Sequence, residues 1–226
     1  MHVAFTPAEV ARAPTGIVVD VLRASSTIAQ ALEAGYRRVL CCAEIDEARA
    51  VREQVGDAVL AGERRAQPIG GFDLGNSPRD FLEPLAGTLV LTTTNGTRAI
   101  VTAAAQCEVV LVGSLLNLDA LAAAAAERGE DVEVVCAGVE GAFALDDAYC
   151  AGRIVELLEG ERTDAAEAAA RLAQSFASAE EALRARNNPR EAVSEDDLLW
   201  CARENASTVL PRFTGMLGPA VEIMAA

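Results

Sequence analysis

Short apolar runs rich in β-branched residues alternate along the chain with longer segments whose apolar positions recur at helical spacing. Six such runs predict strands, at 16–21, 38–43, 58–62, 88–92, 108–113 and 132–138. Four segments between them predict helices, at 26–35, 45–56, 96–106 and 117–129. The strand runs are continuously apolar, which is typical of a sheet buried on both faces. We therefore predict an α/β fold with a largely parallel sheet flanked by helices.

Small residues mark the expected helix ends. Gly35, Gly56 and Gly129 stand where helix C-caps are expected, because glycine readily adopts the left-handed conformation found there. Asn117 is expected to be the N-cap of the helix that follows it.

The last third of the chain has a different pattern. Three segments look helical, without a convincing strand among them, at 145–159, 164–186 and 195–209. A polar break lies at 186–195, and the final stretch, FTGMLGPAVEIMAA, fits neither pattern. We expect residues 1–160 to form the catalytic α/β core and 161–226 to form a helical C-terminal segment that packs on it.

A faint internal likeness runs through the core. The segments VVDVLRASSTIAQALEAG, LVLTTTNGTRAIVTAAA and VLVGSLLNLDALAAAAA share one plan, a strand, a small polar turn and a helix. One interpretation is two related α/β halves, at about 1–85 and 86–160. The other is that any α/β chain shows this alternation, since no strict repeat period follows.

Composition restricts the classes of function. The chain has 226 residues, 51% of them hydrophobic, and can bury a large core. No apolar run approaches the ~20 residues of a membrane helix, and the first residues do not resemble a signal peptide. The net charge of -15 argues against nucleic-acid binding, which needs clustered positive charge. We expect a cytoplasmic protein that binds neither nucleic acid nor membrane.

Missing residue types exclude several reactions. All 19 cationic side chains are arginines, so the P-loop lysine and Schiff-base mechanisms are excluded. His2 is the only histidine, which argues against a Ser-His-Asp triad, a phosphohistidine and a histidine-ligated zinc site. The six cysteines form no CxxC motif and fall mostly in apolar runs, so we expect free buried thiols.

Polar residues collect where predicted strands end, and ligands bind at the carboxyl ends of strands in open parallel sheets. Asp20 and Arg23 follow the first strand, and Ser25, Ser26 and Thr27 lead into a helix. These residues suit a metal and an oxyanion held together. In the alternative interpretation, slightly favoured from these residues alone, Asp20 pairs with Arg23 and Ser25 caps the helix.

The third strand is followed by a long loop, GERRAQPIGGFDLGNSP. Loops of this length in a compact domain are usually functional or disordered, and this one has many apolar residues. The alternative is an ordered Ω-loop in which Asn76 or Ser77 caps a helix starting at Pro78. We favour a functional loop, whose candidate polar residues are Glu63, Arg64, Arg65, Asp73, Asn76 and Ser77.

Two further turns complete the candidate set. TTTNGT follows the fourth strand; its hydroxyls, the Asn95-Gly96 pair and the helix start behind them suit an anion, although many strand-helix turns look alike. Glu140, Asp146 and Asp147 follow the sixth strand. The two aspartates either interact only with the helix dipole or, with Asp20, form an all-oxygen Mg²⁺ site.

Taken together, DVLRASSTI, GERRAQPIGGFDLGNSP, TTTNGTRA and GAFALDDAYCAG resemble the 2-phosphosulfolactate phosphatase family, in order and over about residues 18–152. The resemblance implies an α/β fold and Mg²⁺-dependent hydrolysis of 2-phospho-3-sulfolactate to 3-sulfolactate and phosphate, a step toward coenzyme M. One departure is visible, because the family pattern usually has Glu-Asp where this chain has Asp146-Asp147. The shorter side chain keeps the charge but changes the ligand geometry that the family pattern implies.

The polar turns and the family resemblance together predict roles for individual residues. The expected metal ligands for Mg²⁺ are Asp20, Asp146 and Asp147. The expected catalytic residues are Asp20, Arg23, Glu63 and Asp73. The expected substrate-binding residues are Ser25, Ser26, Thr27, Arg64, Asn76, Ser77, Thr93, Thr94, Asn95, Gly96 and Thr97.

Other interpretations stay open at this point. The substrate could be another small anionic phosphoester, and the same loops could belong to a non-catalytic binder of phosphorylated metabolites. A homodimer that buries the helical segment is also compatible with the sequence.

Overall fold

A computed structural model describes residues 1–9, 13–129, 131–188 and 192–226. It shows one ten-stranded sheet with strand order β1-β8-β2-β7-β9-β10-β3-β6-β4-β5. The strands are β1 (His2–Ala4), β2 (Thr15–Val19), β3 (Arg38–Cys41), β4 (Ala58–Arg64), β5 (Gln67–Pro68), β6 (Thr88–Thr92), β7 (Val109–Gly113), β8 (Val132–Cys136), β9 (Pro211–Leu217) and β10 (Ala220–Ala225). The six predicted strands are therefore all present.

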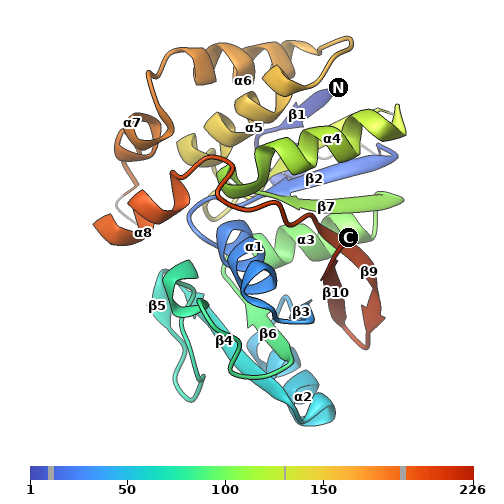
Figure 1. Ribbon diagram of the computed structural model, residues 1–226, viewed down its shortest axis with the longest axis vertical. Helices are drawn as coiled ribbons and strands as arrows, with labels where there is room; N and C mark the ends of the chain where they lie inside the picture. Colours follow the sequence, from blue (N-terminus) through green and yellow to red (C-terminus); the bar gives the residue numbers. More distant parts are fainter. Residues whose placement is uncertain (10–12, 130, 189–191) are drawn as a thin grey trace.

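Helices flank this sheet and confirm the predicted α/β class (Figure 1). They are α1 (Ala24–Ala34), α2 (Ile45–Val55), α3 (Gly96–Ala104), α4 (Leu118–Arg128), α5 (Leu145–Leu157), α6 (Asp164–Gln174), α7 (Ala179–Arg184) and α8 (Glu195–Cys201). Short 3-10 helices lie at η1 (Pro7–Glu9), η2 (Pro78–Asp80) and η3 (Leu115–Asn117). The three glycines predicted to follow helices do so, each with a positive φ, at Gly35, Gly56 and Gly129.

Asn117 stands at the N-cap position of α4, but its side chain does not cap that helix. Its Oδ1 accepts from the backbone N–H of Ser114 at 2.9 Å, which closes the preceding turn η3. Asn117 is therefore at the predicted N-cap position, but its side-chain hydrogen bond stabilises η3 and not α4.

The sheet consists of two parallel blocks joined by an antiparallel hairpin. One block is β1, β8, β2 and β7, and the other is centred on β3, β6 and β4. Each block combines strands from before and after residue 85 in the chain. Between the blocks, β9 pairs with β7, β10 with β9 and β3 with β10, all antiparallel. Three reversals in succession set the second block antiparallel to the first.

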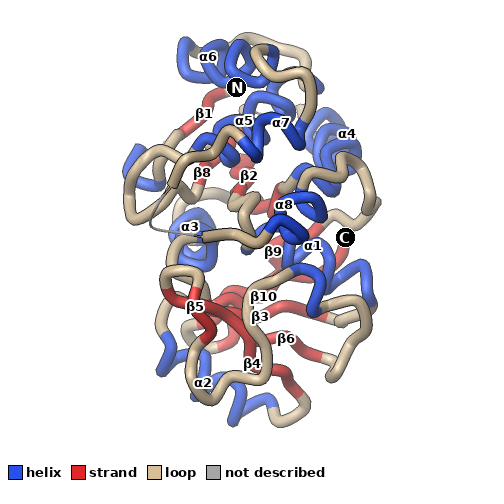
Figure 2. The backbone as a smooth tube through the Cα atoms, turned by 90° about the vertical axis from the view of Figure 1, so that its left-hand side faces the viewer, coloured by secondary structure: helices blue, strands red, loops and turns tan. Residues whose placement is uncertain are grey.

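A flat sheet of this order would put the carboxyl ends of β2 and β6 on opposite edges. Strands in sheets twist relative to their neighbours, and over ten strands the twist accumulates. The result is that both blocks face a common core, which joins Val18 and Val112 of one block to Leu91 of the other. That core also contains Ile28 of α1 and Ile100 of α3, and these two helices lie between the blocks (Figure 2). The polar turns that start α1 and α3 therefore meet.

The described C-terminal residues contain helices in the regions where helices are predicted. The predicted helix at 164–186 is divided into α6 and α7, and the one at 195–209 ends early, as α8. The final stretch, which fitted neither pattern in the sequence, forms the hairpin β9–β10. Side chains on β9 alternate between buried or half-buried and exposed positions, so this strand lacks the continuous apolar run of the others.

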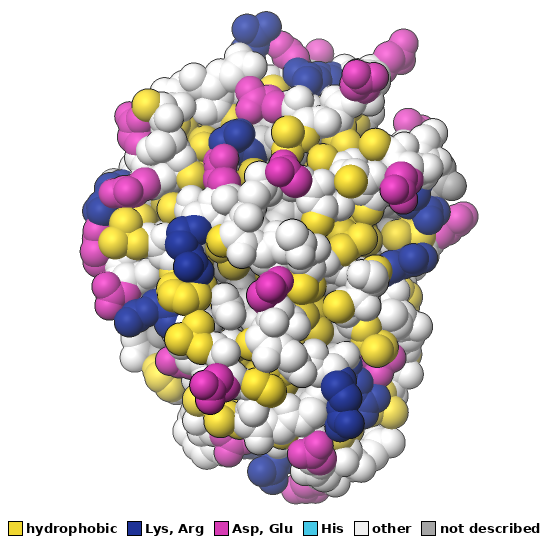
Figure 3. Space-filling view, viewed as in Figure 1, with side chains coloured by type: hydrophobic (Ala, Val, Ile, Leu, Met, Phe, Trp, Pro, Cys, Tyr) yellow, Lys and Arg dark blue, Asp and Glu magenta, His cyan; other side chains and the backbone are white. Residues whose placement is uncertain are grey.

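Acidic and arginine side chains are interspersed over the face of the molecule shown in Figure 3. Within the described residues, no helix has both the length and the apolar character needed to cross a membrane. All six cysteines are buried and free, as the sequence predicts.

Candidate active site

A pocket lies where the turns after β2, β4 and β6 meet. Its lining residues are Asp20, Leu22, Arg23, Glu63, Ala66, Asn76, Asn95 and Val193. Five of these eight belong to the residues predicted from the sequence, and they come from four separate segments of the chain. The pocket thus combines carboxylate, guanidinium and amide groups in one place.

The turn after β2 presents Asp20 and Arg23 to this pocket. The Oδ1 atom of Asp20 accepts from the backbone N–H of Ala24 at 3.2 Å, at the start of α1. The hydroxyls of Ser25 and Ser26 donate to the carbonyl oxygens of Asp20 and Val21 at 2.7 and 2.8 Å. These two hydroxyls hold the turn in shape.

Two more contacts tie this turn to distant segments. Thr27 Oγ1 donates to the carbonyl oxygen of Asn76 at 3.1 Å, which joins α1 to the long loop. The Nη1 atom of Arg23 donates to Asp197 Oδ2 at 2.6 Å. Arg23 is therefore paired with a carboxylate from the C-terminal part of the chain, and Ser25 is not the N-cap residue, a position that Arg23 occupies.

Glu63 is buried at the end of β4 and fixes the TTTNGT turn. Its two carboxylate oxygens accept from the backbone N–H and the hydroxyl of Thr94, at 2.7 and 3.0 Å. The same carboxylate accepts from the N–H of Ala66 at 2.7 Å, and Thr94 Oγ1 accepts from the N–H of Arg65 at 2.8 Å. Glu63 thus joins the β4–β5 turn to the turn after β6 at the wall of the pocket.

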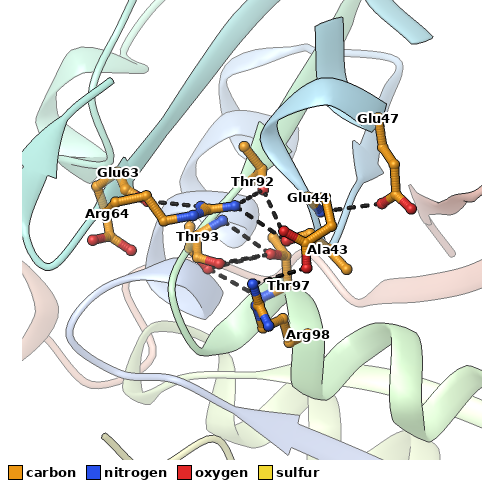
Figure 4. Close-up of polar contacts among 9 residues, drawn as sticks. All are labelled: Ala43, Glu44, Glu47, Glu63, Arg64, Thr92, Thr93, Thr97 and Arg98. Atoms are coloured by element: carbon orange, nitrogen blue, oxygen red, sulfur yellow. Dashed lines mark hydrogen bonds and ion pairs between the residues drawn. The ribbon is translucent and has the colours of Figure 1, made fainter. Parts of the chain in front are cut away.

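Arg64 is not among the lining residues of this pocket, and its guanidinium points toward Thr92 of β6 (Figure 4). Its guanidinium donates to the carbonyl oxygens of Glu63 and Ala43 and to Thr92 Oγ1, at 2.8, 3.1 and 2.8 Å. Burial lowers the pKa of Arg64, and the nearby charge of Arg98 acts in the same direction. Both arginines line a neighbouring pocket, which shares Asn95 with the first.

Beyond the β4–β5 turn, the long loop contributes Asn76 to the first pocket and is attached through Asp73 and Ser77. Asp73 Oδ2 accepts from the backbone N–H of Leu60 at 2.8 Å, which fastens the loop to β4. Ser77 precedes η2, but its hydroxyl donates to Asp197 Oδ1 at 2.6 Å instead of capping. Asn76 is 4% exposed, and its Oδ1 accepts no hydrogen bond from the described residues. A buried acceptor without a donor at the wall of a pocket indicates a missing partner.

The TTTNGT turn is held by two reciprocal hydrogen bonds. Thr97 Oγ1 accepts from the N–H of Thr93 at 2.9 Å, and Thr93 Oγ1 accepts from the N–H of Thr97 at 3.0 Å. Both side chains are buried. Asn95 lines the pocket, and its Oδ1 accepts from the N–H of Glu140 at 2.9 Å. Gly96 lies so close to the turn after β2 that a Cβ there would overlap the Asp20 carboxylate and the Ala24 side chain.

Asp146 and Asp147 lie in the first turn of α5, both buried. Asp147 accepts from the backbone N–H groups of Val21 and Gly138, each at 2.9 Å, and so joins the turns after β2 and β8. Burial raises the pKa of Asp147 well above its usual range, and the charges of Asp146 and Asp20 add to this effect. Asp146 lies 3.3 Å from Arg186, and burial raises its pKa although that arginine opposes the shift.

The three aspartates expected to hold Mg²⁺ therefore differ in position, because Asp20 lines the pocket and Asp146 and Asp147 do not. The described residues contain no cluster of three or more carboxylate, cysteine or histidine side chains arranged for a metal. Asp20 and the unsatisfied Asn76 Oδ1 do line one pocket, and both are oxygen donors. Mg²⁺ typically takes one or two carboxylates and completes its shell with phosphate oxygens and water. The pocket fits such an ion through Asp20 and Asn76, with Asp147 behind Asp20.

The residue that sequence reasoning missed is Asp197. It is 2% exposed and accepts from both Arg23 and Ser77. A signal was available, because Asp197 and the apolar Cys201 are four positions apart and so share one face of a helix. A carboxylate at the spacing of an apolar face is expected to be buried and paired.

Comparison with known proteins shows a likeness that covers most of the chain. The family model described as 2-phosphosulpholactate phosphatase matches residues 4–215. The 2-phosphosulfolactate phosphatase of Methanothermobacter thermautotrophicus is 39% identical over 86% of this chain and 84% of its own. Probable 2-phosphosulfolactate phosphatases of Thermotoga petrophila and Thermus thermophilus are 36% and 38% identical over 93% and 91% of this chain, and over 94% and 90% of their own.

The family match and the relatives define the class of the protein, a phosphoric monoester hydrolase, and its fold is a mostly parallel α/β sheet. Matches of this extent show more than the class. The chain belongs to the 2-phosphosulfolactate phosphatase family.

Proposed function

We propose that this protein is a Mg²⁺-dependent phosphatase that hydrolyses 2-phospho-3-sulfolactate to 3-sulfolactate and phosphate. Family membership and the names of the relatives support the substrate. The reaction is of the kind that leads toward coenzyme M, and a cytoplasmic location is part of the proposal. The substrate class, a small phosphoester with further anionic groups, suits a pocket that holds an arginine and an amide side chain.

One observation carries the metal dependence, the buried Asn76 Oδ1 with no donor among the described residues, in the same pocket as Asp20. A cation satisfies such an oxygen as well as a hydrogen-bond donor does, and a carboxylate beside it adds charge. In the proposal, Asp20 and Asn76 hold Mg²⁺, which when bound would polarise a phosphoryl oxygen. Asp147 shapes this site from behind through its bonds to Val21 and Gly138.

The protein groups have distinct roles in the proposed reaction. Hydrolysis breaks the bond between phosphorus and the ester oxygen; water supplies the hydroxyl to phosphate and a proton to the leaving oxygen. Arg23 offsets the charge that develops on the phosphoryl oxygens, and the Asn95 amide binds the same group from the facing turn. Glu63 keeps Thr94 and Ala66 in place at the wall. The serine and threonine hydroxyls of both turns hold these groups in position.

The test is phosphate release from 2-phospho-3-sulfolactate by the purified protein, first with Mg²⁺, then with EDTA, then with Mg²⁺ restored. We expect turnover with Mg²⁺, a fall in kcat of at least about 100-fold with EDTA, and recovery of turnover when Mg²⁺ is restored. The reason is that a bound metal would stabilise the transition-state charge by several kcal/mol. Unchanged turnover in EDTA would refute the metal dependence. A panel of phosphorylated hydroxy acids tests the substrate, and a higher kcat/KM for one without a sulfonate would refute that assignment.

A second measurement distinguishes two routes of attack. If Asp20 itself attacks phosphorus, rapid quenching during turnover traps phosphate on the protein, and the Asp20→Asn variant traps none. If water attacks, no phosphoprotein accumulates in either protein.

A further inference from the structure

Asp197 of α8 lies behind the proposed active site and binds two of its elements at once. Its Oδ2 accepts from Arg23 and its Oδ1 from Ser77, both at 2.6 Å. The side chains of Asp197 and Arg23 are 3% and 13% exposed. Charge-assisted hydrogen bonds of this length, shielded from water, are among the stronger polar contacts in proteins.

The helix that carries Asp197 is itself firmly attached. Ser194 caps it, since its Oγ accepts from the backbone N–H of Asp197 at 3.2 Å. Trp200 Nε1 donates to Gln30 of α1 at 3.3 Å, and Cys201 is fully buried. At the outer side, Asp196 pairs with Arg79 of η2 at 3.0 Å. Asp197 therefore projects from an element that is anchored to both α1 and η2.

The contacts of Asp197 matter because of the places of its two partners, Arg23 and Ser77. Arg23 lines the pocket, and an arginine has several rotatable bonds whose freedom must be removed before its guanidinium can orient on a phosphoryl group. Ser77 follows Asn76, the residue with the unsatisfied oxygen. One carboxylate thus fixes the guanidinium on one wall and the loop that carries the amide on the other.

We propose that Asp197 is a positioning residue of this enzyme, which sets the orientation of Arg23 and the place of the Asn76–Ser77 segment without contacting the substrate. The inference rests on the proposed function, because it assigns Asp197 to the pocket in which phosphoester hydrolysis takes place. It gives the C-terminal helical part a role in the site, which lies mostly in residues 20–95.

The chain offers a matched control in the neighbouring residue. Asp196→Asn removes a carboxylate from the same helix that is 67% exposed and pairs with a different arginine, Arg79. We expect Asp197→Asn to lower kcat/KM by about 10- to 100-fold, the size of effect caused by misplacing a group by about 1 Å. We expect Asp196→Asn to stay within about two-fold of the wild type, because exposed ion pairs contribute little. Equal kcat/KM in the two variants would overturn the proposal.

Unfolding must be separated from mispositioning, so Arg23 is varied as well. If Asp197 acts through Arg23, then Asp197→Asn costs much less kcat/KM in an Arg23→Gln background than in the wild type. A general loss of packing would instead multiply the two effects, and that result would overturn the proposal.

Ser77→Ala is the milder variant if Asp197→Asn does not fold. It removes one of the two bonds, and we expect a loss of about 3- to 10-fold, smaller than for Asp197→Asn because the bond to Arg23 is kept. An unchanged kcat/KM there would count against the proposal.

Separate measurements test the positioning role of Asp197 and the proposed phosphatase activity. Turnover of 2-phospho-3-sulfolactate by the wild-type protein tests the function alone. If the wild type shows none, calorimetric titration with inorganic phosphate in the presence of Mg²⁺ still compares Asp197→Asn with Asp196→Asn. Weaker phosphate binding only in Asp197→Asn supports the positioning role, and equal binding in both overturns it.

Discussion

The two turns that meet at the pocket look alike in sequence and differ in what they present. Each follows a parallel strand, is rich in hydroxyls and starts a helix, α1 in one case and α3 in the other. The turn after β2 exposes Asp20 and Arg23 to the pocket, while the turn after β6 exposes only Asn95. In both, the hydroxyls bond within the protein, as those of Ser26 and Thr93 do.

This difference shows how to interpret hydroxyl-rich strand-helix turns. A row of serines and threonines before a helix resembles a phosphate cradle, but short hydroxyl side chains also bond readily to nearby backbone. Here the hydroxyls build the turns, and the groups left at the pocket are a carboxylate, a guanidinium and an amide. We therefore propose that the turn after β2 carries the reactive groups and that the turn after β6 supports it.

The largest effect is expected at Asp20. Asp20→Asn keeps an oxygen that can accept from the Ala24 N–H, so the start of α1 is preserved, but it removes the charge. We expect kcat to fall by about 10²- to 10³-fold, the loss typical of removing one preorganised electrostatic group. Steady-state phosphate release with Mg²⁺ is the measurement. Asp46→Asn, at a carboxylate that is 96% exposed, is the control. Full Mg²⁺-dependent turnover by Asp20→Asn would show that the Asp20 charge is not needed for catalysis. The turn after β2 would then be no more reactive than the turn after β6.

The fold was predictable where strands carry long apolar runs. All six such runs became strands, because their composition reflects burial on both faces. The strands without that signal were missed, and they are the three-residue β1, the two-residue β5 and the hairpin β9–β10. The Gly218-Pro219 pair between β9 and β10 is a turn signal, but the half-exposed alternation on β9 is weak. The insertion of this hairpin between two parallel blocks depends on tertiary packing that no local pattern encodes.

The sequence predicted the residues of the candidate site about as well as it predicted the fold. The rule that ligands collect after parallel strands led to Asp20, Arg23, Glu63, Asn76 and Asn95, which the pocket brings together. The sequence could not tell which carboxylates would reach the pocket, because Asp20, Asp73 and Asp147 have the same side chain and all accept from backbone N–H groups, but of these three Asp20 alone lines the pocket. That division depends on which backbone donors lie nearby once distant segments are packed.

The contact between the two turns can be tested at Gly96. A side-chain methyl there would overlap the Asp20 carboxylate and Ala24, so Gly96→Ala must push the turns apart. We expect a loss of about 1–3 kcal/mol in the free energy of unfolding, the usual cost of overpacking, with a lower kcat because Asp20 moves. Chemical denaturation and phosphate release are the two measurements. Gly215→Ala is the control, since nothing lies within 4 Å of its added methyl. Equal stability of the two variants would show that the turns do not touch.

The smallest effect on activity is expected for the hydroxyls themselves. Thr93→Ala removes the acceptor for the N–H of Thr97, and Ser26→Ala removes the donor to the carbonyl of Val21. We expect each to cost about 0.5–2 kcal/mol of stability, the range for a lost helix cap or a buried hydrogen bond, with kcat and KM within about two-fold of the wild type. The measurements are thermal unfolding and steady-state kinetics side by side. If Thr93→Ala instead keeps its stability and raises KM ten-fold, its hydroxyl contacts the phosphate. The turn after β6 would then be part of the binding surface and no longer only a support for the turn after β2.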